Sequence, residues 1–292
     1  MVKREERGKQ MNLALISFRF GNQLTSLFAP SWTAKRALNK FLTPRKFIQK
    51  PWEIEAESLG IRFNLNQQIS AVRWQPNSDK SISKKVLLVH GWESRATQMY
   101  SLVPTLLKLN YQVVAVDMPG HGKSEGIISD ADKFAEAVVL AQEKLGKFDV
   151  IIGHSMGAGA AAIALSRGID CGKLVLISGP SSVENVIRRF SSFIGLNSNA
   201  INWFIEHCTE QVGVAPSVLD STRLLSIVET PTLIIHDKDD VEVPITESKR
   251  LLPVFSNCEL FITEGLGHRR ILKSEQTLQK ITDFLTNSQV MA

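Results

Sequence analysis

Apolar residues gather in short runs along most of the chain, and their spacing predicts strands. Residues 61–65 and 69–74 alternate apolar and polar side chains, and the polar residues between them favour a hairpin. Later runs are mostly apolar, and the run at residues 86–89 is continuously apolar, as expected of a strand that is buried on both faces. These runs lie at residues 86–89, 112–116, 150–152, 173–178, 232–236 and 259–262.

Segments with helical spacing alternate with these runs. They lie at residues 101–109, 131–145, 156–167, 247–252 and 274–285. Gly146 predicts the end of the 131–145 helix, because glycine readily adopts the backbone conformation that closes many helices. Repeated strand–helix–strand alternation forms a mostly parallel sheet that is flanked by helices on both faces. The sequence therefore predicts an α/β fold.

Residues 180–228 interrupt the alternation, since they contain no obvious strand. They do contain several aromatic side chains, namely Phe190, Phe193, Trp203 and Phe204. Such an insertion is either a long loop or a small helical cap, and its aromatic content favours the cap. We predict a domain over residues 51–292 that includes this cap, preceded by a basic arm over residues 1–50.

The arm holds most of the positive charge. Residues 1–50 contain eleven lysines and arginines and two glutamates, a net charge of +9, so the other residues carry −4 of the chain's net +5. Apolar residues of the arm recur near the 3.6-residue spacing of one helical face. They are Leu13, Leu15, Ile16, Phe20, Leu24, Leu27 and Phe28. We expect either a partly helical arm whose apolar stripe packs on the body or a disordered arm. The alternative is a basic amphipathic helix in peripheral contact with a membrane.

The composition, with 43% hydrophobic and 22% charged residues, is that of a globular protein with a sizeable core. No apolar run is long enough to cross a membrane, and polar residues interrupt the apolar stretch after Met11 before any cleavage site of a signal peptide. The three cysteines lack paired spacing, which fits a reducing compartment, so we expect a cytoplasmic protein. The body lacks the interleaved basic and aromatic residues of a nucleic-acid-binding face, and no metal-ligand spacing is present.

Polar residues that can carry out catalysis follow several of the predicted strands. In an open parallel α/β sheet, ligands bind at the carboxyl ends of the strands. Ser155 follows the strand at 150–152, three aspartates follow the strand at 232–236, and His268 follows the last strand. We therefore expect a serine, a carboxylate and a histidine to meet at one edge of the sheet.

Ser155 lies in the sequence GHSMG (153–157), a G-x-S-x-G motif between a strand and a helix. This motif makes a sharp turn that exposes the serine hydroxyl, and its glycines let neighbouring backbone pass close by. The helix amino terminus favours the negative charge that develops during acyl transfer. The alternative is a plain helix-capping serine. We predict Ser155 as the nucleophile and His268 as the base that takes its proton.

An acid and two oxyanion donors complete such a site. Three acids compete to orient His268, namely Asp237, Asp239 and Asp240. One oxyanion donor is the backbone N–H of Met156, directly after the serine, and the other is that of Trp92 or, in its place, Gly91. The Trp92 ring either lines the acyl pocket or packs against other side chains.

These motifs resemble the α/β-hydrolase superfamily, in particular its serine esterases, lipases and thioesterases. The matching segments span roughly residues 61–290, in the family order of serine, acid and histidine. They are VLLVHGW (86–92), VDMPGHGKS (116–124), IIGHSMGAGAA (151–161), LIIHDKDDVEVP (233–244) and EGLGHRR (264–270). In this family the acid stands three residues before a Val-Pro pair, as Asp240 does before Val243, so the resemblance favours Asp240. The family more often has glycine at the position of Asp237, which leaves Asp237 and Asp239 open as alternatives.

The resemblance implies a serine hydrolase that cleaves a small-molecule carboxylic ester or thioester through an acyl-enzyme intermediate, without a metal or a cofactor. Ser155 excludes the dehalogenase and epoxide-hydrolase branches, which use an aspartate nucleophile. Hydrolysis of an amide, a lactone or a carbon–carbon bond would use the same three residues, and a non-catalytic binding protein can share the fold. The choice of substrate depends on the cap, whose shape the sequence does not define.

Overall fold

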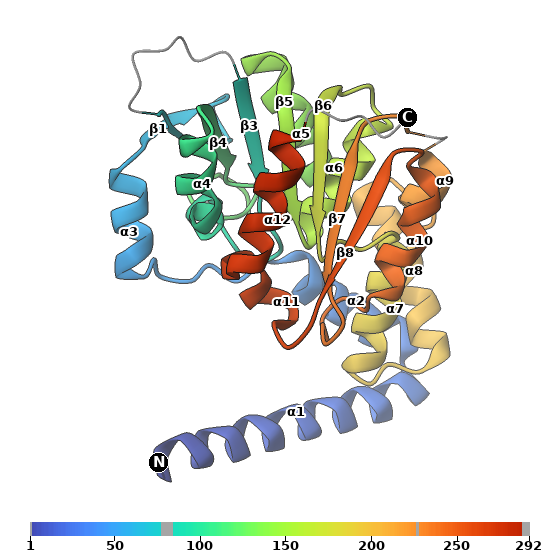
Figure 1. Ribbon diagram of the computed structural model, residues 1–292. Helices are drawn as coiled ribbons and strands as arrows, with labels where there is room; N and C mark the ends of the chain where they lie inside the picture. The colour runs from blue at the N-terminus through green and yellow to red at the C-terminus, as the bar shows by residue number, and fades with distance from the viewer. Residues whose placement is uncertain (1, 77–83, 226–227, 288–292) are drawn as a thin grey trace. The chain divides into compact units, whose positions relative to one another are not determined.

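Figure 1 shows the fold of the chain as a computed structural model. It describes residues 2–76, 84–225 and 228–287, with side chains from residue 13 onward. The described residues belong to two compact units, a larger one within residues 43–182 and 219–292 and a smaller one within residues 1–42 and 183–218. Residues 226 and 227, at the end of the predicted cap, lie outside the described residues.

The larger unit is built on one sheet of eight strands. In spatial order these are β1 (Ile61–Asn64), β2 (Ser70–Trp74), β4 (Tyr111–Val116), β3 (Lys84–Val89), β5 (Phe148–His154), β6 (Cys171–Ile177), β7 (Thr232–Asp237) and β8 (Cys258–Thr263). β1 and β2 form the predicted hairpin, β2 pairs antiparallel with β4, and the other strand pairs are parallel. The predicted mostly parallel α/β sheet is confirmed.

The strand order reverses at β3, which lies between β4 and β5. At such a reversal the connections leave the sheet in opposite directions, and a crevice remains beyond the carboxyl ends of the strands. Ser155 directly follows β5, so the topology brings the predicted nucleophile to this crevice.

Helices cover both faces of this sheet, with α4 and α12 on one face and α5 and α6 on the other (Figure 1). The helical segments of this unit are α3 (Pro51–Ser58), η1 (Ala96–Leu102), α4 (Val103–Lys108), α5 (Ala131–Leu145), α6 (Met156–Leu165), α9 (Ser221–Leu224), α10 (Thr246–Leu251), η2 (Leu252–Val254), α11 (Gly267–Arg270), η3 (Ile271–Lys273) and α12 (Glu275–Thr286). Val86 and Leu88 of β3 share one apolar core with residues of η1, α4 and α12. The alternate residues of β3, Leu87 and Val89, point to the opposite face.

Two helical segments differ from the sequence prediction. The helix predicted at 101–109 begins as the 3₁₀ segment η1 and becomes α-helical at Val103, because Pro104 stands in the first turn of α4, where a missing N–H loses no intrahelical partner. The apolar pattern also missed α3. Pro51 starts this helix, and the Glu53 carboxylate accepts the N–H of Lys50 at 2.9 Å, so capping rather than periodicity defines it.

The smaller unit contains α1 (Val2–Phe28), α2 (Pro30–Leu42), α7 (Val183–Phe193) and α8 (Ser198–Val212). α7 and α8 come from the predicted cap insertion, and their aromatic side chains pack on α2. The ring centroid of Phe41 lies 4.8 Å from that of Phe190 and 5.5 Å from that of Phe204. The domain boundaries that we infer from the sequence, at residues 50 and 51, stay a prediction.

Within the smaller unit, the apolar stripe of α1 does not pack on the other helices. Six of its seven residues are exposed, and only Leu15 is half-buried. The buried side of α1 instead carries polar residues, since Asn22 and Ser26 are each 1% exposed. Asn22 Nδ2 donates to the Ile194 carbonyl at 2.8 Å. A helical pattern shows that two faces differ in polarity, and here hydrogen bonds decide which of them lies inside.

Candidate active site

Ser155 lies on a strained turn between β5 and α6. Its backbone has φ 55° and ψ −125°, in a region that residues other than glycine rarely adopt. A Cβ atom at Gly157 would collide with the carbonyl oxygen of Val89, and one at Gly153 would lie 2.6 Å from Ala158 Cα. Glycine is therefore required on both sides of the turn, as the G-x-S-x-G motif indicated.

Ser155, His268 and Asp240 form one chain of hydrogen bonds. His268 Nε2 lies 2.9 Å from Ser155 Oγ, and His268 Nδ1 lies 2.7 Å from Asp240 Oδ2. Asp240 is 6% exposed and His268 is 8% exposed. With the proton on Nδ1, His268 donates to the carboxylate and leaves Nε2 free to accept from the serine hydroxyl. The structure thus brings together the serine, the histidine and one of the three competing acids.

The carboxyl group of Asp240 is held in its charged form. Its Oδ1 accepts the N–H groups of Glu242 and Val243, both at 2.9 Å, which leaves Oδ2 for His268. Burial alone would raise the pKa of Asp240, but the hydrogen bonds from His268 and Val243 and the nearby imidazole charge hold it below its usual value. An ionised carboxylate at this place stabilises a positively charged imidazole.

The other two aspartates brace the loop that carries His268. Asp237 Oδ2 accepts the hydroxyl of Thr263 at 2.7 Å and the N–H of Leu266 at 3.0 Å. Asp239 Oδ2 accepts the N–H of Gly265 at 2.8 Å. Both carboxylates therefore tie the turn after β7 to the turn after β8, and neither contacts the imidazole of His268.

The predicted oxyanion donors lie on both sides of Ser155. Met156 is the first residue of α6, at the helix amino terminus. A Cβ atom added to Gly91 would lie 2.8 Å from Ser155 Cβ, so the turn after β3, which continues into Trp92, passes directly beside the serine. The Trp92 ring packs against His121, at 5.0 Å between centroids, and is stacked on Phe134 at 6.2 Å. The ring thus packs against other side chains, and a place for it in the acyl pocket stays a prediction.

Comparison with known proteins agrees with this architecture. A family model described as "Alpha/beta hydrolase family" matches residues 86–217. The solved structure of Est1E from Butyrivibrio proteoclasticus with ferulic acid bound has a TM-score of 0.61 at 19% identity, over 76% of this chain and 95% of that chain, which shows a common fold. The chain therefore has the α/β-hydrolase fold, and its residues 86–217 match the α/β-hydrolase family.

Two curated relatives of this α/β hydrolase are similar over most of their length. The 2-hydroxy-6-oxononadienedioate/2-hydroxy-6-oxononatrienedioate hydrolase of Cupriavidus pinatubonensis is 25% identical over 253 residues, which cover 70% of this chain and 88% of that protein. The bifunctional esterase/perhydrolase DCH of Acinetobacter calcoaceticus is 27% identical over 240 residues, which cover 65% of this chain and 87% of that protein. The family match and these relatives support a hydrolase.

His154 is a site residue whose role the sequence did not reveal. Its Nε2 donates to the carbonyl oxygen of His268 at 2.8 Å, and the two rings lie 4.9 Å apart between centroids. Burial, with a smaller contribution from the charge of His268, lowers the pKa of His154 to about 3. His154 is therefore neutral and anchors the backbone of His268. Its place between Gly153 and Ser155 was the only available signal.

His90 and His121 play a similar part at the turn after β3. His90 Nδ1 donates to the Gly91 carbonyl at 2.7 Å, and His90 Nε2 accepts the N–H of Met118 at 3.0 Å. His121 Nε2 accepts the N–H of Glu93 at 3.1 Å. Burial lowers the pKa of both histidines, so each stays neutral and keeps one donor and one acceptor. They fix the backbone on either side of Trp92.

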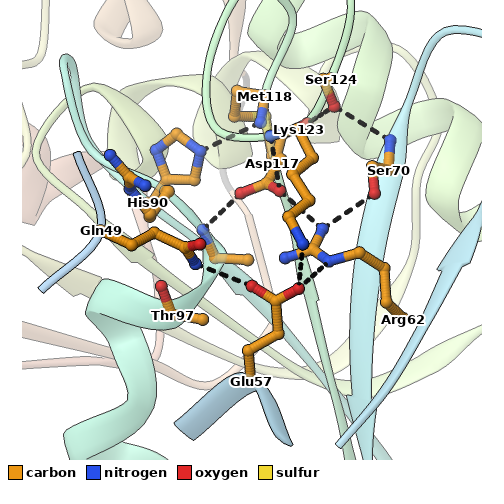
Figure 2. Close-up of polar contacts among 12 residues, drawn as sticks. Gln49, Glu57, Arg62, Ser70, His90, Thr97, Asp117, Met118, Lys123 and Ser124 are labelled. Atoms are coloured by element: carbon orange, nitrogen blue, oxygen red, sulfur yellow. Dashed lines mark hydrogen bonds and ion pairs between the residues drawn. The ribbon is translucent and has the colours of Figure 1, made fainter. Parts of the chain in front are cut away.

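The VDMPGHGKS segment supports the site through a partly buried ionic network, which Figure 2 shows. Asp117 Oδ1 accepts the N–H of Ala96 at 2.8 Å, and Oδ2 accepts from Arg62 Nη1 at 2.8 Å. Glu57 lies 2.7 Å from Arg62 Nε and 2.5 Å from Lys123 Nζ. Burial alone would raise the pKa of Glu57, but the hydrogen bonds from Arg62 and Lys123 lower it to about 2. The network ties α3, β1 and η1 to the loop after β4.

The described ranges, 2–76, 84–225 and 228–287, contain no group of three or more histidine, cysteine, aspartate or glutamate side chains arranged to hold a metal ion.

Proposed function

We propose that this α/β hydrolase is a serine hydrolase that cleaves a carboxylic ester or thioester of a small molecule. The observation that carries the proposal is the chain of hydrogen bonds from Ser155 through His268 to Asp240. Each of the three follows a different strand, so the sheet brings all three to the same edge.

In the acylation step, Ser155 Oγ attacks the carbonyl carbon of the substrate and His268 Nε2 takes the serine proton. The negatively charged Asp240 stabilises the resulting imidazolium. When the tetrahedral intermediate collapses, the bond from the carbonyl carbon to the leaving oxygen or sulfur breaks. His268 then delivers its proton to the leaving alcohol or thiol, and an ester of Ser155 remains.

In the deacylation step, water takes the place of the leaving group. His268 removes a proton from the water, which attacks the acyl-enzyme carbonyl, and then returns that proton to Ser155 Oγ. The products are a carboxylic acid and the free enzyme. The N–H groups of Met156 and Trp92 are assigned to the oxyanion in both steps, and the amino terminus of α6 favours its charge.

Hydrolysis of a carbon–carbon bond is the second candidate, because of the relative from Cupriavidus pinatubonensis. The substrate after which this relative is named carries hydroxyl, keto and carboxylate groups but no ester. The same serine and histidine would act on such a compound. The same three residues can also hydrolyse amides and lactones. The alternative to an enzyme is a non-catalytic binding protein that shares the fold.

The proposal is tested with p-nitrophenyl esters of increasing acyl length, measured beside a thioester, an amide and a 2-hydroxy-6-oxo-dienoate. Ser155→Ala serves as the blank in each case. A fluorophosphonate probe supplies an independent test, since it labels only an activated serine. We expect the probe to label the wild type and not Ser155→Ala. Equal labelling of both proteins would overturn the serine-hydrolase proposal. If the wild type turns over the dienoate and none of the other substrates, carbon–carbon bond hydrolysis replaces ester hydrolysis as the proposed reaction.

A further inference from the structure

The long helix α1 presents an apolar stripe to solvent. The stripe consists of Leu13, Ile16, Phe20, Leu24 and Leu27. Their spacings of three and four residues place them on one side of the helix, and each is between 49% and 68% exposed. Phe28 and Trp32 continue the apolar surface at the junction with α2 and are 82% and 57% exposed. We call these seven residues the α1 face.

The opposite side of α1 carries the buried polar residues Asn22 and Ser26 beside Phe18, which packs on the apolar core of the smaller unit. Asn22 donates to the Ile194 carbonyl, and Asn197 Nδ2 donates to the Ser26 carbonyl at 2.9 Å. The loop between α7 and α8 approaches so closely that a Cβ atom at Gly195 would lie 2.9 Å from the Arg19 carbonyl oxygen. A helix at the surface of a water-soluble domain normally has the reverse orientation, with its apolar stripe inward. This orientation leaves the α1 face available to an apolar partner.

Basic residues belong to the same arm of the chain as this face. Residues 1–50 carry a net charge of +9, while the rest of the chain carries −4. In the smaller unit, Lys35 and Lys40 on α2 are exposed, and Lys35 lies one helical turn after Trp32. The guanidinium of Arg36 lies over the Trp32 ring, 5.1 Å from its centroid. Aromatic rings beside lysine and arginine are the composition found at the boundary between lipid and water.

We propose that the α1 face binds the surface of an anionic lipid membrane, with α1 lying along the membrane plane. The apolar stripe would enter the acyl region, and the basic residues would remain among the headgroups. Pairing of this face with the same face of a second copy of the chain is disfavoured, because the two basic arms would repel each other. In the described part of the chain, no helix has both the length and the apolarity to cross a membrane. The inference does not depend on the proposed hydrolysis.

The test is co-sedimentation of the full-length protein with phosphatidylcholine vesicles, with and without about 30% phosphatidylserine. The double variant Ile16→Glu/Leu24→Glu removes two residues of the stripe. Its matched control is Leu59→Glu/Ile127→Glu, which changes the net charge equally at two exposed apolar positions of the larger unit, 64% and 79% exposed. A third variant, Ile16→Ser/Leu24→Ser, removes the same stripe residues without adding charge.

We expect the wild type and the control to pellet with anionic vesicles and to be released by salt, which screens the attraction to the headgroups. We expect the glutamate variant to bind at least about tenfold more weakly than the control, and the serine variant to be weakened in the same direction. Circular dichroism verifies that each variant is folded.

Three results would overturn the inference. The first is binding by the folded glutamate and serine variants that equals wild-type binding. The second is wild-type protein that stays in the supernatant with both kinds of vesicle, or that binds neutral vesicles equally well. The third is a wild-type protein that does not bind vesicles and is a dimer by light scattering after gel filtration, while the stripe variants are monomers. That last outcome would assign the face to contact between copies of the chain.

Discussion

Replacing Asp240 by asparagine changes the hydrogen bonding of the proposed acid without changing its size. In the structure, one carboxylate oxygen accepts two backbone N–H groups, from Glu242 and Val243, and the other accepts Nδ1–H of His268 at 2.7 Å. An asparagine can keep both backbone bonds only if its oxygen takes the first position. Its NH₂ group then faces Nδ1–H, and two donors cannot form a hydrogen bond with each other.

The imidazole relieves this conflict by moving its proton from Nδ1 to Nε2. Nε2 lies 2.9 Å from Ser155 Oγ, and once it carries a hydrogen it cannot accept the serine proton. We expect kcat to fall about 10⁴-fold, the loss seen when the histidine of a Ser-His-Asp triad is held in the wrong tautomer, or roughly 5.4 kcal/mol of transition-state stabilisation. KM should change little, since Asp240 is buried and binds no part of the substrate.

The assay is steady-state hydrolysis of the p-nitrophenyl ester that the wild type cleaves best. Asp239→Asn is the matched control, because Asp239 accepts the N–H of Gly265 and does not contact His268, and an asparagine oxygen can keep that bond. Its kcat should change by less than about threefold. If Asp240→Asn retains more than about a tenth of the wild-type kcat, or if both variants lose activity equally, the tautomer argument is refuted.

Three further predictions concern the groups around the site. His154→Ala removes the N–H that holds the His268 carbonyl, and we expect a 10- to 100-fold lower kcat from a displaced imidazole, with KM unchanged in the same ester assay. Gly157→Ala puts a Cβ atom against the carbonyl oxygen of Val89, and we expect it to cost more than about 2 kcal/mol of unfolding free energy, measured by urea denaturation. The pKa of Glu57 is lowered from 4.5 to about 2 in the folded protein, so its contribution to stability is present above about pH 4.5 and is lost as the pH falls toward 2. The unfolding free energies of wild type and Glu57→Gln should therefore converge over this range, and a constant difference would contradict the assignment.

Sequence patterns were sufficient for the sheet because buried parallel strands carry a simple signal. Continuous apolar runs such as residues 86–89 and 150–152 are stable only where both faces of the strand are buried, which is between two layers of helices. The positions of Ser155 and His268 followed from the same reasoning, since parallel strands deliver their following residues to one edge. Strand order could anticipate that the two residues meet at this edge, and the structure adds the 2.9 Å contact between them.

The competing acids could not be separated from the residues alone. Asp237 is the last residue of β7 and is paired in register with Thr263 of β8, so its side chain bonds to that neighbour. Asp240 lies beyond the strand in a turn whose N–H groups orient its carboxylate toward His268. The conformation of the loop between Asp237 and Asp240 decides which of the two meets His268, and a loop has no periodic pattern in the sequence. The orientation of α1 escaped prediction for a related reason, because hydrogen bonds of Asn22, not apolar burial, decide which side faces inward.

The backbone of Ser155 has a consequence for protein engineering. A residue with a side chain loses roughly 1–2 kcal/mol in the left-handed conformation that this turn imposes, whereas glycine adopts it freely. Random libraries sorted only for heat resistance should therefore enrich Ser155→Gly, which relieves the strain and removes the hydroxyl. Directed evolution of a thermostable form of this protein would need selection for turnover in every round, because stability by itself favours the loss of the nucleophile.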